Sequence, residues 1–437
     1  MSELEVSTKF QNSVEIKFDN EFEKQWDSQQ QLKNLPVKSR IIPHTRRQSR
    51  FFRLLHTLLY TDATLTFFTS LCYGIFPCGF RRHSYKCKYS FISIALTTMH
   101  WFCFASYVYF VCVYWSDSRY GVVMPLETKT IMIGLLASAA CTYSLATVYF
   151  YSSKNNFTCG NQEDPKFSIF PRFEFRLPGK SNRDLNIGPT ENDWFHTNVF
   201  LFLGFFCSSW VIFVDFRYNA FFDFVNNHGF LGTLSSVEKL HYHLSVSTGF
   251  FGFYATACAV CIYHIITRDL IRHIEETEDF VLKEAKDRAD FQVALTALQS
   301  YGKKLLQSLK WWFNVHTLFF FFLVSAMIFG WIKIFEKADQ NTMYFNKLLL
   351  SQIGGSMYIA FKFSFPFLSA SQITTRYNVF YYRIARHCKI VNLPELSILY
   401  SDSGIKMFGI HITSNFAVTA LFLSFLGALK MITFSKS

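Results

Sequence analysis

Seven long apolar stretches are the feature that most constrains how this chain folds. They cover residues 91–114, 131–151, 196–214, 244–267, 313–332, 348–371 and 407–434. Each is close to the length of about 20 residues that a helix needs to cross a hydrocarbon core about 30 Å thick. Because that core offers no water to backbone N–H and C=O groups, each stretch must satisfy those groups as a helix. The sequence therefore predicts an all-α integral membrane protein with seven transmembrane helices.

The composition agrees with this class. Hydrophobic residues make up 50% of the chain and charged residues only 17%, whereas a typical soluble domain has about 25% charged residues. The positive net charge of +12 is explained by basic loops that face an anionic inner leaflet. The lipid bilayer is thus the expected partner, and no nucleic acid is expected.

The positions of the 43 Lys and Arg residues predict the orientation, because cytoplasmic loops are enriched in both. With a cytoplasmic N-terminus, segments 1–88, 152–195, 268–311 and 372–406 face the cytoplasm and hold most of them. The other side then holds only Arg119, Lys129, Arg217, Lys239, Lys333, Lys337, Lys347, Lys430 and Lys436. We therefore expect a cytoplasmic N-terminus and an extracellular C-terminus.

The chain divides by pattern into three parts: a cytoplasmic tail (1–53), a segment at the cytoplasmic side (54–88) and the seven-helix domain (89–437). Residues 54–78 are almost as apolar as a span, but basic residues flank them on both sides. A crossing there would invert the sides of all later loops and remove the charge bias. The segment 54–88 is therefore predicted to be amphipathic or re-entrant.

Two cytoplasmic stretches, 268–311 and 372–406, are predicted to form a helical anchor. In the first, an acidic run at 275–279 precedes basic residues at 283–288, a spacing typical of an exposed helix. Such a run is usually a solvated face. Apolar residues among the charges, Phe280 and Leu298 among them, also favour a packed helical pair below the membrane.

The sequence contains no motif that predicts catalysis. It has no Gly-rich phosphate loop, no H-E-x-x-H and no G-x-S-x-G, so no enzyme and no cofactor are expected. His241 and His243 lie at the end of an apolar stretch, where histidines are more often interfacial polar residues than ligands, so no metal site is expected either.

Aromatic and polar residues in the predicted outer halves of the spans are candidates for a ligand pocket. Aromatic walls with a few polar anchors suit a small organic ligand, although aromatic residues at such spacing also serve ordinary helix packing. The candidates are Trp210, Phe250, Tyr254, Gln352 and Tyr358.

Lys362 is an ionisable residue inside the sixth span. Such a group is costly in hydrocarbon and usually faces the bundle interior or water. The alternative is that its side chain extends to the inner headgroups.

The layout resembles that of the invertebrate gustatory-receptor-like chemoreceptors of the insect gustatory and odorant receptor superfamily. Gly74-Ile75-Phe76-Pro77 matches a G-x-x-P of that family, and 404–413 is similar to the beginning of its last helix. The family's last helix carries Thr-Tyr, five apolar residues and Gln-Phe. Here those positions are Leu426-Gly427 and Thr433-Phe434, which retain only the final Phe, as in a divergent member.

The resemblance implies a chemosensory receptor, gustatory-like, in the plasma membrane, acting as a ligand-gated cation channel for small organic molecules. It implies a homo- or hetero-tetramer whose seventh helices line a central pore. The pore or gate residues are then Leu426, Gly427, Lys430, Thr433 and Phe434. A lysine near the outer end of that helix is expected to reach the outer surface.

Three alternatives remain open from the sequence. One is a light- or oxidant-sensing member of the same fold. Another is a G-protein-coupled receptor, because 215–218 reads Asp-Phe-Arg-Tyr, similar to that class's Asp-Arg-Tyr, but the charge distribution opposes its orientation. The third is a secondary transporter, which an internal repeat would indicate; we find no repeat.

Overall fold

The structure is a computed structural model that describes residues 50–73, 94–102, 104–106, 108–109, 137–144, 175, 177–179, 189–218, 236–336, 342–387, 404–407, 410–413, 415–416, 419 and 426. Contacts divide the chain into two compact units, Met1–Leu55 and His56–Ser437, and the long helices belong to the second unit. The G-x-x-P motif, most of 407–434 and nearly all of the tail lie outside the described residues. The count of seven spans and the side of each terminus therefore stay predictions.

The described elements are helical apart from one short ladder, which confirms the all-α class. The main helices are α2 (Arg50–Tyr60), α3 (Ala63–Tyr73), α6 (Glu191–Tyr218), α9 (Ser236–Lys283), α10 (Arg288–Glu336) and α11 (Thr342–His387). The ladder pairs β1 (Lys406–Met407) with β2 (Ile410–His411) in antiparallel register. By length and composition alone, two described helical stretches could cross a membrane, Phe251–Lys283 and Trp312–Ile332.

Side-chain caps fix where two of the long helices begin. The Thr190 hydroxyl accepts a bond from Asp193 N at 3.3 Å, while Asp193 Oδ2 accepts one from Thr190 N at 2.9 Å. This reciprocal box satisfies N–H groups that have no partner within α6. At α10, Asp290 N donates to Asp287 Oδ1 at 2.9 Å. Asp287 therefore caps the N-terminus of α10, in the short turn that follows the end of α9 at Lys283.

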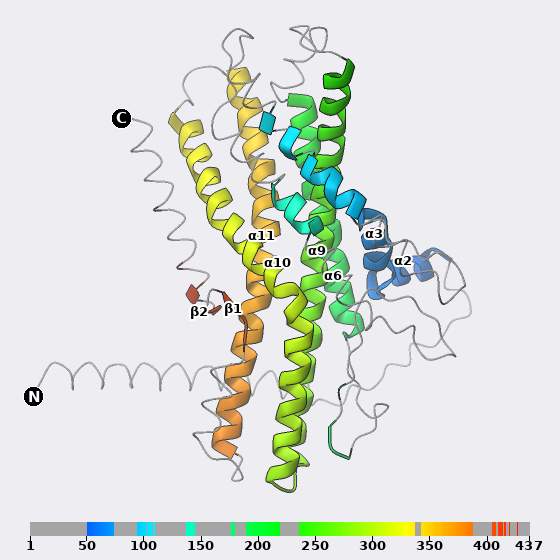
Figure 1. Cartoon of the computed structure of the whole chain (residues 1–437), viewed down its shortest axis with the longest axis vertical. Helices are drawn as coiled ribbons and strands as arrows, with labels where there is room; N and C mark the ends of the chain where they lie inside the picture. Colours follow the sequence, from blue (N-terminus) through cyan, green and yellow to red (C-terminus); the bar gives the residue numbers. More distant parts are fainter. Residues whose placement is uncertain are drawn as a thin grey trace, which may run out of the picture. The chain divides into compact units, whose positions relative to one another are not determined.

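Helix α9 is the element that most of the others contact. It packs against α3, α6, α10 and α11, and α11 also packs against α6 and α10; Figure 1 shows α9, α10 and α11 running side by side. Buried small residues of α9, such as Ala255, Ala257 and Cys258, allow its neighbours to approach closely, as is typical of helix contacts in membranes.

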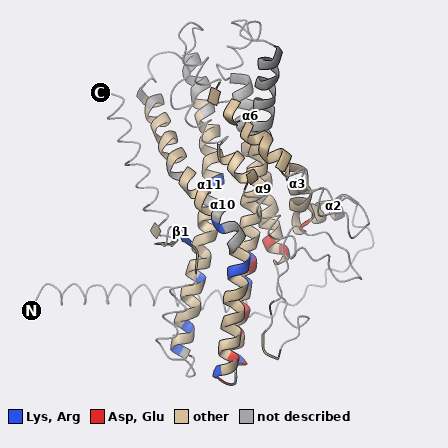
Figure 2. Ribbon diagram, in the orientation of Figure 1, with Lys and Arg blue, Asp and Glu red and all other residues tan. Residues whose placement is uncertain are grey.

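Charged residues are segregated along the three longest helices. Helix α9 has no Asp, Glu, Lys or Arg between Lys239 and Arg268, and α10 has none between Lys310 and Lys333. Among the residues of these three helices whose side chains the structure describes, the charges lie in the C-terminal parts of α9 and α11 and the N-terminal part of α10 (Figure 2), with the exception of Lys362 of α11. This charged end of the bundle corresponds to 268–311 and 372–387, which the sequence assigns to the cytoplasmic anchor.

Helix α3, from the segment 54–88, packs into the bundle. Its residues Leu65 and Tyr73 are buried, and the Tyr73 hydroxyl donates to the Ala255 carbonyl at 2.7 Å. Cys72 Sγ lies 4.0 Å from Cys258 Sγ. Both α9 residues lie inside the predicted span 244–267, and the amphipathic or re-entrant form of 54–88 stays a prediction.

Two adjacent glycines of α11 provide a matched test of helix packing. A Cβ at Gly354 would overlap the indole ring of Trp210 on α6, whereas one at Gly355 would meet nothing within 4 Å. Both alanine variants gain the same helix propensity, about 1 kcal/mol. We expect Gly354→Ala to lower the thermal unfolding midpoint in detergent relative to Gly355→Ala, by overpacking worth about 1–3 kcal/mol. Equal midpoints would show that α6 and α11 do not touch there.

Candidate functional site

Three of the five predicted ligand residues come together where α6, α9 and α11 pack. Trp210 lies against Gly354, and the Tyr254 hydroxyl is 2.9 Å from Ser209 Oγ of α6. The Tyr358 hydroxyl donates to the Phe253 carbonyl at 3.3 Å. Aromatic rings and hydroxyls from three helices therefore meet in the apolar part of the bundle, next to the buried Lys362.

The other two predicted ligand residues are placed differently. Gln352 faces α10, because its Nε2 donates to the Met327 carbonyl at 2.7 Å and lies 2.7 Å from where a Cβ at Gly330 would be. It is thus held at the α10–α11 contact and not at the α6–α9–α11 contact. Phe250 belongs to α9, but its side chain lies outside those that the structure describes.

Lys362 lies inside the bundle with its side chain fully buried. Its Nζ is 5.7 Å from the centroid of the Tyr358 ring, a distance at which an ammonium is attracted to the ring face. Its backbone carbonyl is 2.7 Å from His316 Nε2 of α10. Of the two positions that the sequence left open for Lys362, this burial favours the bundle interior.

Most of the predicted pore residues lie outside the described part of the chain. This holds for Gly427, Lys430, Thr433 and Phe434, while Leu426 is described and exposed. Their role stays a prediction.

The chain before the predicted pore residues is attached to α11, a link that the sequence did not predict. Ile405 N donates to Thr374 Oγ1 of α11 at 3.4 Å, and Ile412 N donates to Ile405 O at 2.9 Å. Gly404 takes a φ of +79°, which a residue with a side chain rarely adopts. This tight turn brings the β1–β2 ladder against α11.

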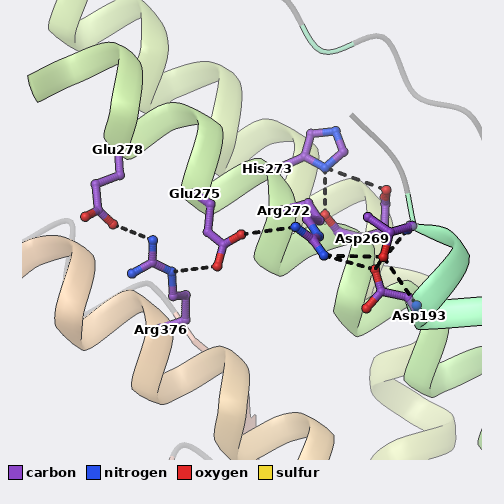
Figure 3. Close-up of polar contacts among 8 residues, drawn as sticks. Asp193, Asp269, Arg272, His273, Glu275, Glu278 and Arg376 are labelled. Carbon is purple, nitrogen blue, oxygen red and sulfur yellow. Dashed lines mark hydrogen bonds and ion pairs between the residues drawn. The ribbon is translucent and has the colours of Figure 1, made fainter. Parts of the chain in front are cut away.

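A partly buried ion-pair network joins α9 to α11 at the charged end of the bundle (Figure 3). Glu278 is 2% exposed and accepts from Arg376 Nη2 at 2.6 Å and from Arg383 Nη1 at 2.8 Å. Arg376 Nε also lies 3.8 Å from Glu275 Oε1. Two guanidinium groups therefore neutralise one nearly buried carboxylate.

The network continues to α6 through Arg272, which lies 3.7 Å from Glu275 and 3.3 Å from Asp193. Burial raises the pKa of Asp193, but the hydrogen bonds from Thr190 and the charge of Arg272 outweigh it, so that the pKa lies below its usual value. Because the pKa of Asp193 is lower in the folded than in the unfolded state, its ionised carboxylate stabilises the fold above the unfolded-state pKa. This stabilisation is lost as the pH falls through the folded-state pKa. At neutral pH the α6–α9 link is therefore intact.

The sequence indicated an exposed or packed helix at 275–288, but it could not pair the charges. Asp193, Glu278 and Arg376 come from three helices that are distant in sequence. The only available signal was that Arg376 and Arg383 are seven residues apart, about two turns, and so lie on one face of α11.

Removing the Glu278 charge should weaken the bundle strongly. Glu278→Gln removes the carboxylate charge that both Arg376 and Arg383 contact, and breaking a buried pair costs about 3 kcal/mol or more. We expect a clearly lower unfolding midpoint in detergent. The control is Asp279→Asn, which removes an exposed pair with Lys283 worth about 1 kcal/mol at most. Equal shifts in the two variants would contradict a structural role for Glu278.

The fold is similar to that of solved insect chemoreceptors. No protein-family model matches the sequence, and a search of curated proteins finds no match. Among solved structures, the olfactory receptor OR5 from Machilis hrabei in complex with eugenol has a TM-score of 0.60 at 10% sequence identity, covering 88% of this chain and 100% of that chain. The OR5 structure solved without a named ligand has a TM-score of 0.55, also at 10% identity, over 88% of this chain and 99% of that one. The chain therefore has a fold similar to that of this insect olfactory receptor.

Proposed function

We propose that this protein is a chemosensory receptor of the plasma membrane that acts as a ligand-gated cation channel for small organic molecules. The observation that carries the proposal is the fold similarity to an insect olfactory receptor along that receptor's whole length. One of the two similar structures is a complex with eugenol, which supports a small organic ligand here. A gustatory-like role is the finer form of the proposal.

The proposed ligand site is the contact of α6, α9 and α11. Trp210, Tyr254 and Tyr358 supply rings and hydroxyls there, at a level where the helices carry no acidic residues. Such a surface suits an apolar ligand with one or two hydrogen-bonding groups. Gln352 and Phe250 remain candidates at its margin.

The proposed gating step uses the attachment between α11 and the chain that enters the last span. A ligand that packs better in one arrangement of α6, α9 and α11 shifts the population toward it. The hydrogen bond between Ile405 and Thr374 connects α11 directly to the segment before Leu426. A displacement of α11 would therefore move that segment. In the proposed homo- or hetero-tetramer, that segment leads to the pore lined by Leu426, Gly427, Lys430, Thr433 and Phe434.

The orientation separates this proposal from the G-protein-coupled alternative. Epitope tags at the two termini, probed in intact and then permeabilised cells, should show a hidden N-terminus and an accessible C-terminus. This follows from the excess of Lys and Arg in the segments assigned to the cytoplasm. An accessible N-terminus with a hidden C-terminus would overturn the channel proposal.

The ligand site is tested by currents evoked in cells that express the protein, with a panel of small aromatic and aliphatic compounds that includes eugenol. Tyr254→Phe removes the hydroxyl that contacts Ser209, and we expect the half-maximal concentration of an active compound to change by about tenfold, as for the loss of one hydrogen bond. Tyr382→Phe, at an exposed position near the charged end of α11, is the control. An unchanged response in both Tyr254→Phe and Trp210→Ala would show that the ligand does not bind where α6, α9 and α11 meet.

A further inference from the structure

The exposed face of α10 changes character along its length. Lys303, Lys304 and Lys310 are exposed, and further along the helix so are Leu318, at 60%, and Phe322, at 43%. With 3.6 residues per turn, these five positions fall within about a third of the helix circumference. One stripe of α10 is thus basic in its first part and apolar in its second.

The change occurs where the apolar stretch Trp312–Ile332 begins. Lys310 lies two residues before this stretch. Lys303 lies on the same side, about 10 Å further from the stretch along the helix axis at 1.5 Å per residue. A headgroup layer is about 5–8 Å thick on each side of a bilayer, and lysine side chains extend several ångströms from the backbone. The three ammonium groups therefore lie within reach of the headgroups that adjoin this stretch.

Among the described residues, no acidic side chain forms an ion pair with Lys303, Lys304 or Lys310. Helix α10 has no Asp or Glu between Asp290 and Glu336. The acidic residue of α9 that faces this part of α10, Asp269, accepts a hydrogen bond from the Tyr301 hydroxyl. The stripe thus presents an excess of positive charge to its surroundings.

We propose that this stripe binds an anionic phospholipid of the inner leaflet, with a phosphorylated headgroup on Lys303, Lys304 and Lys310 and the acyl chains along Leu318 and Phe322. Three lysines on one face match a headgroup with several negative charges, and basic clusters next to a span attract such lipids. The inference rests on the membrane placement in the proposed function, but not on ligand gating.

Binding is measured with the purified full-length protein in detergent and a fluorescent short-chain phosphatidylinositol bisphosphate. The variant Lys303→Gln, Lys304→Gln, Lys310→Gln should bind at least about tenfold more weakly, since each lysine near a lipid surface contributes to attraction. The control Lys283→Gln, Lys286→Gln, Arg288→Gln removes the same charge at the far end of the anchor and should bind within about twofold of the unmodified protein. Equal losses in the two variants would overturn the proposal, because they would reflect net charge alone.

Two further results separate the lipid from other occupants. The double variant Leu318→Ser, Phe322→Ser should bind the short-chain lipid more weakly but free inositol trisphosphate equally well. If the unmodified protein binds the free headgroup as tightly as the lipid, the stripe is a phosphate site and the proposal is overturned. A change in oligomer size in the lysine variant would show that a second copy of the chain covers this face, which would also overturn the proposal. Since no current is recorded, failure here leaves the ligand-gating test unaffected.

Discussion

The closure of backbone hydrogen bonds within each long helix is the constraint on which the rest of this structure depends. A chain that crosses a bilayer must close its N–H and C=O groups within each segment, and the result is a set of long, uninterrupted helices such as the 48-residue α9. Polar and apolar side chains can then be separated along the length of a helix, with charged residues in one part and apolar residues in another. The segregation of charge toward one end of α9, α10 and α11 follows from this arrangement.

The sequence predicted the fold class well and the contacts between helices poorly, for a physical reason. Apolar length is a local property, so 244–267 and 313–332 could be identified as helices from the residues alone. The pairing of Glu278 with Arg376, and the contact of Trp210 with Gly354, depend on the rotation and crossing of helices that are distant in sequence. Hydropathy carries no information about either.

The candidate ligand site shows the same division. Trp210, Tyr254 and Tyr358 were chosen as aromatic residues at a common depth, and they do lie where α6, α9 and α11 meet. Gln352 was chosen by the same criterion of depth, yet it lies on the side of α11 that faces α10. Depth follows from counting residues from the end of a span, whereas the direction of a side chain around the helix requires the neighbours to be known.

The unbroken course of α9 links the two ends of the bundle thermodynamically. Its residue Tyr254 contributes to the proposed ligand site, and its residue Glu278 anchors the ion-pair network more than six turns away. If a ligand alters how α9 packs against α11, then whatever alters the network must alter ligand affinity by the same factor, because coupling between binding equilibria is reciprocal. Ionic conditions at the charged end of the bundle would thereby become part of what sets the affinity of the proposed ligand site.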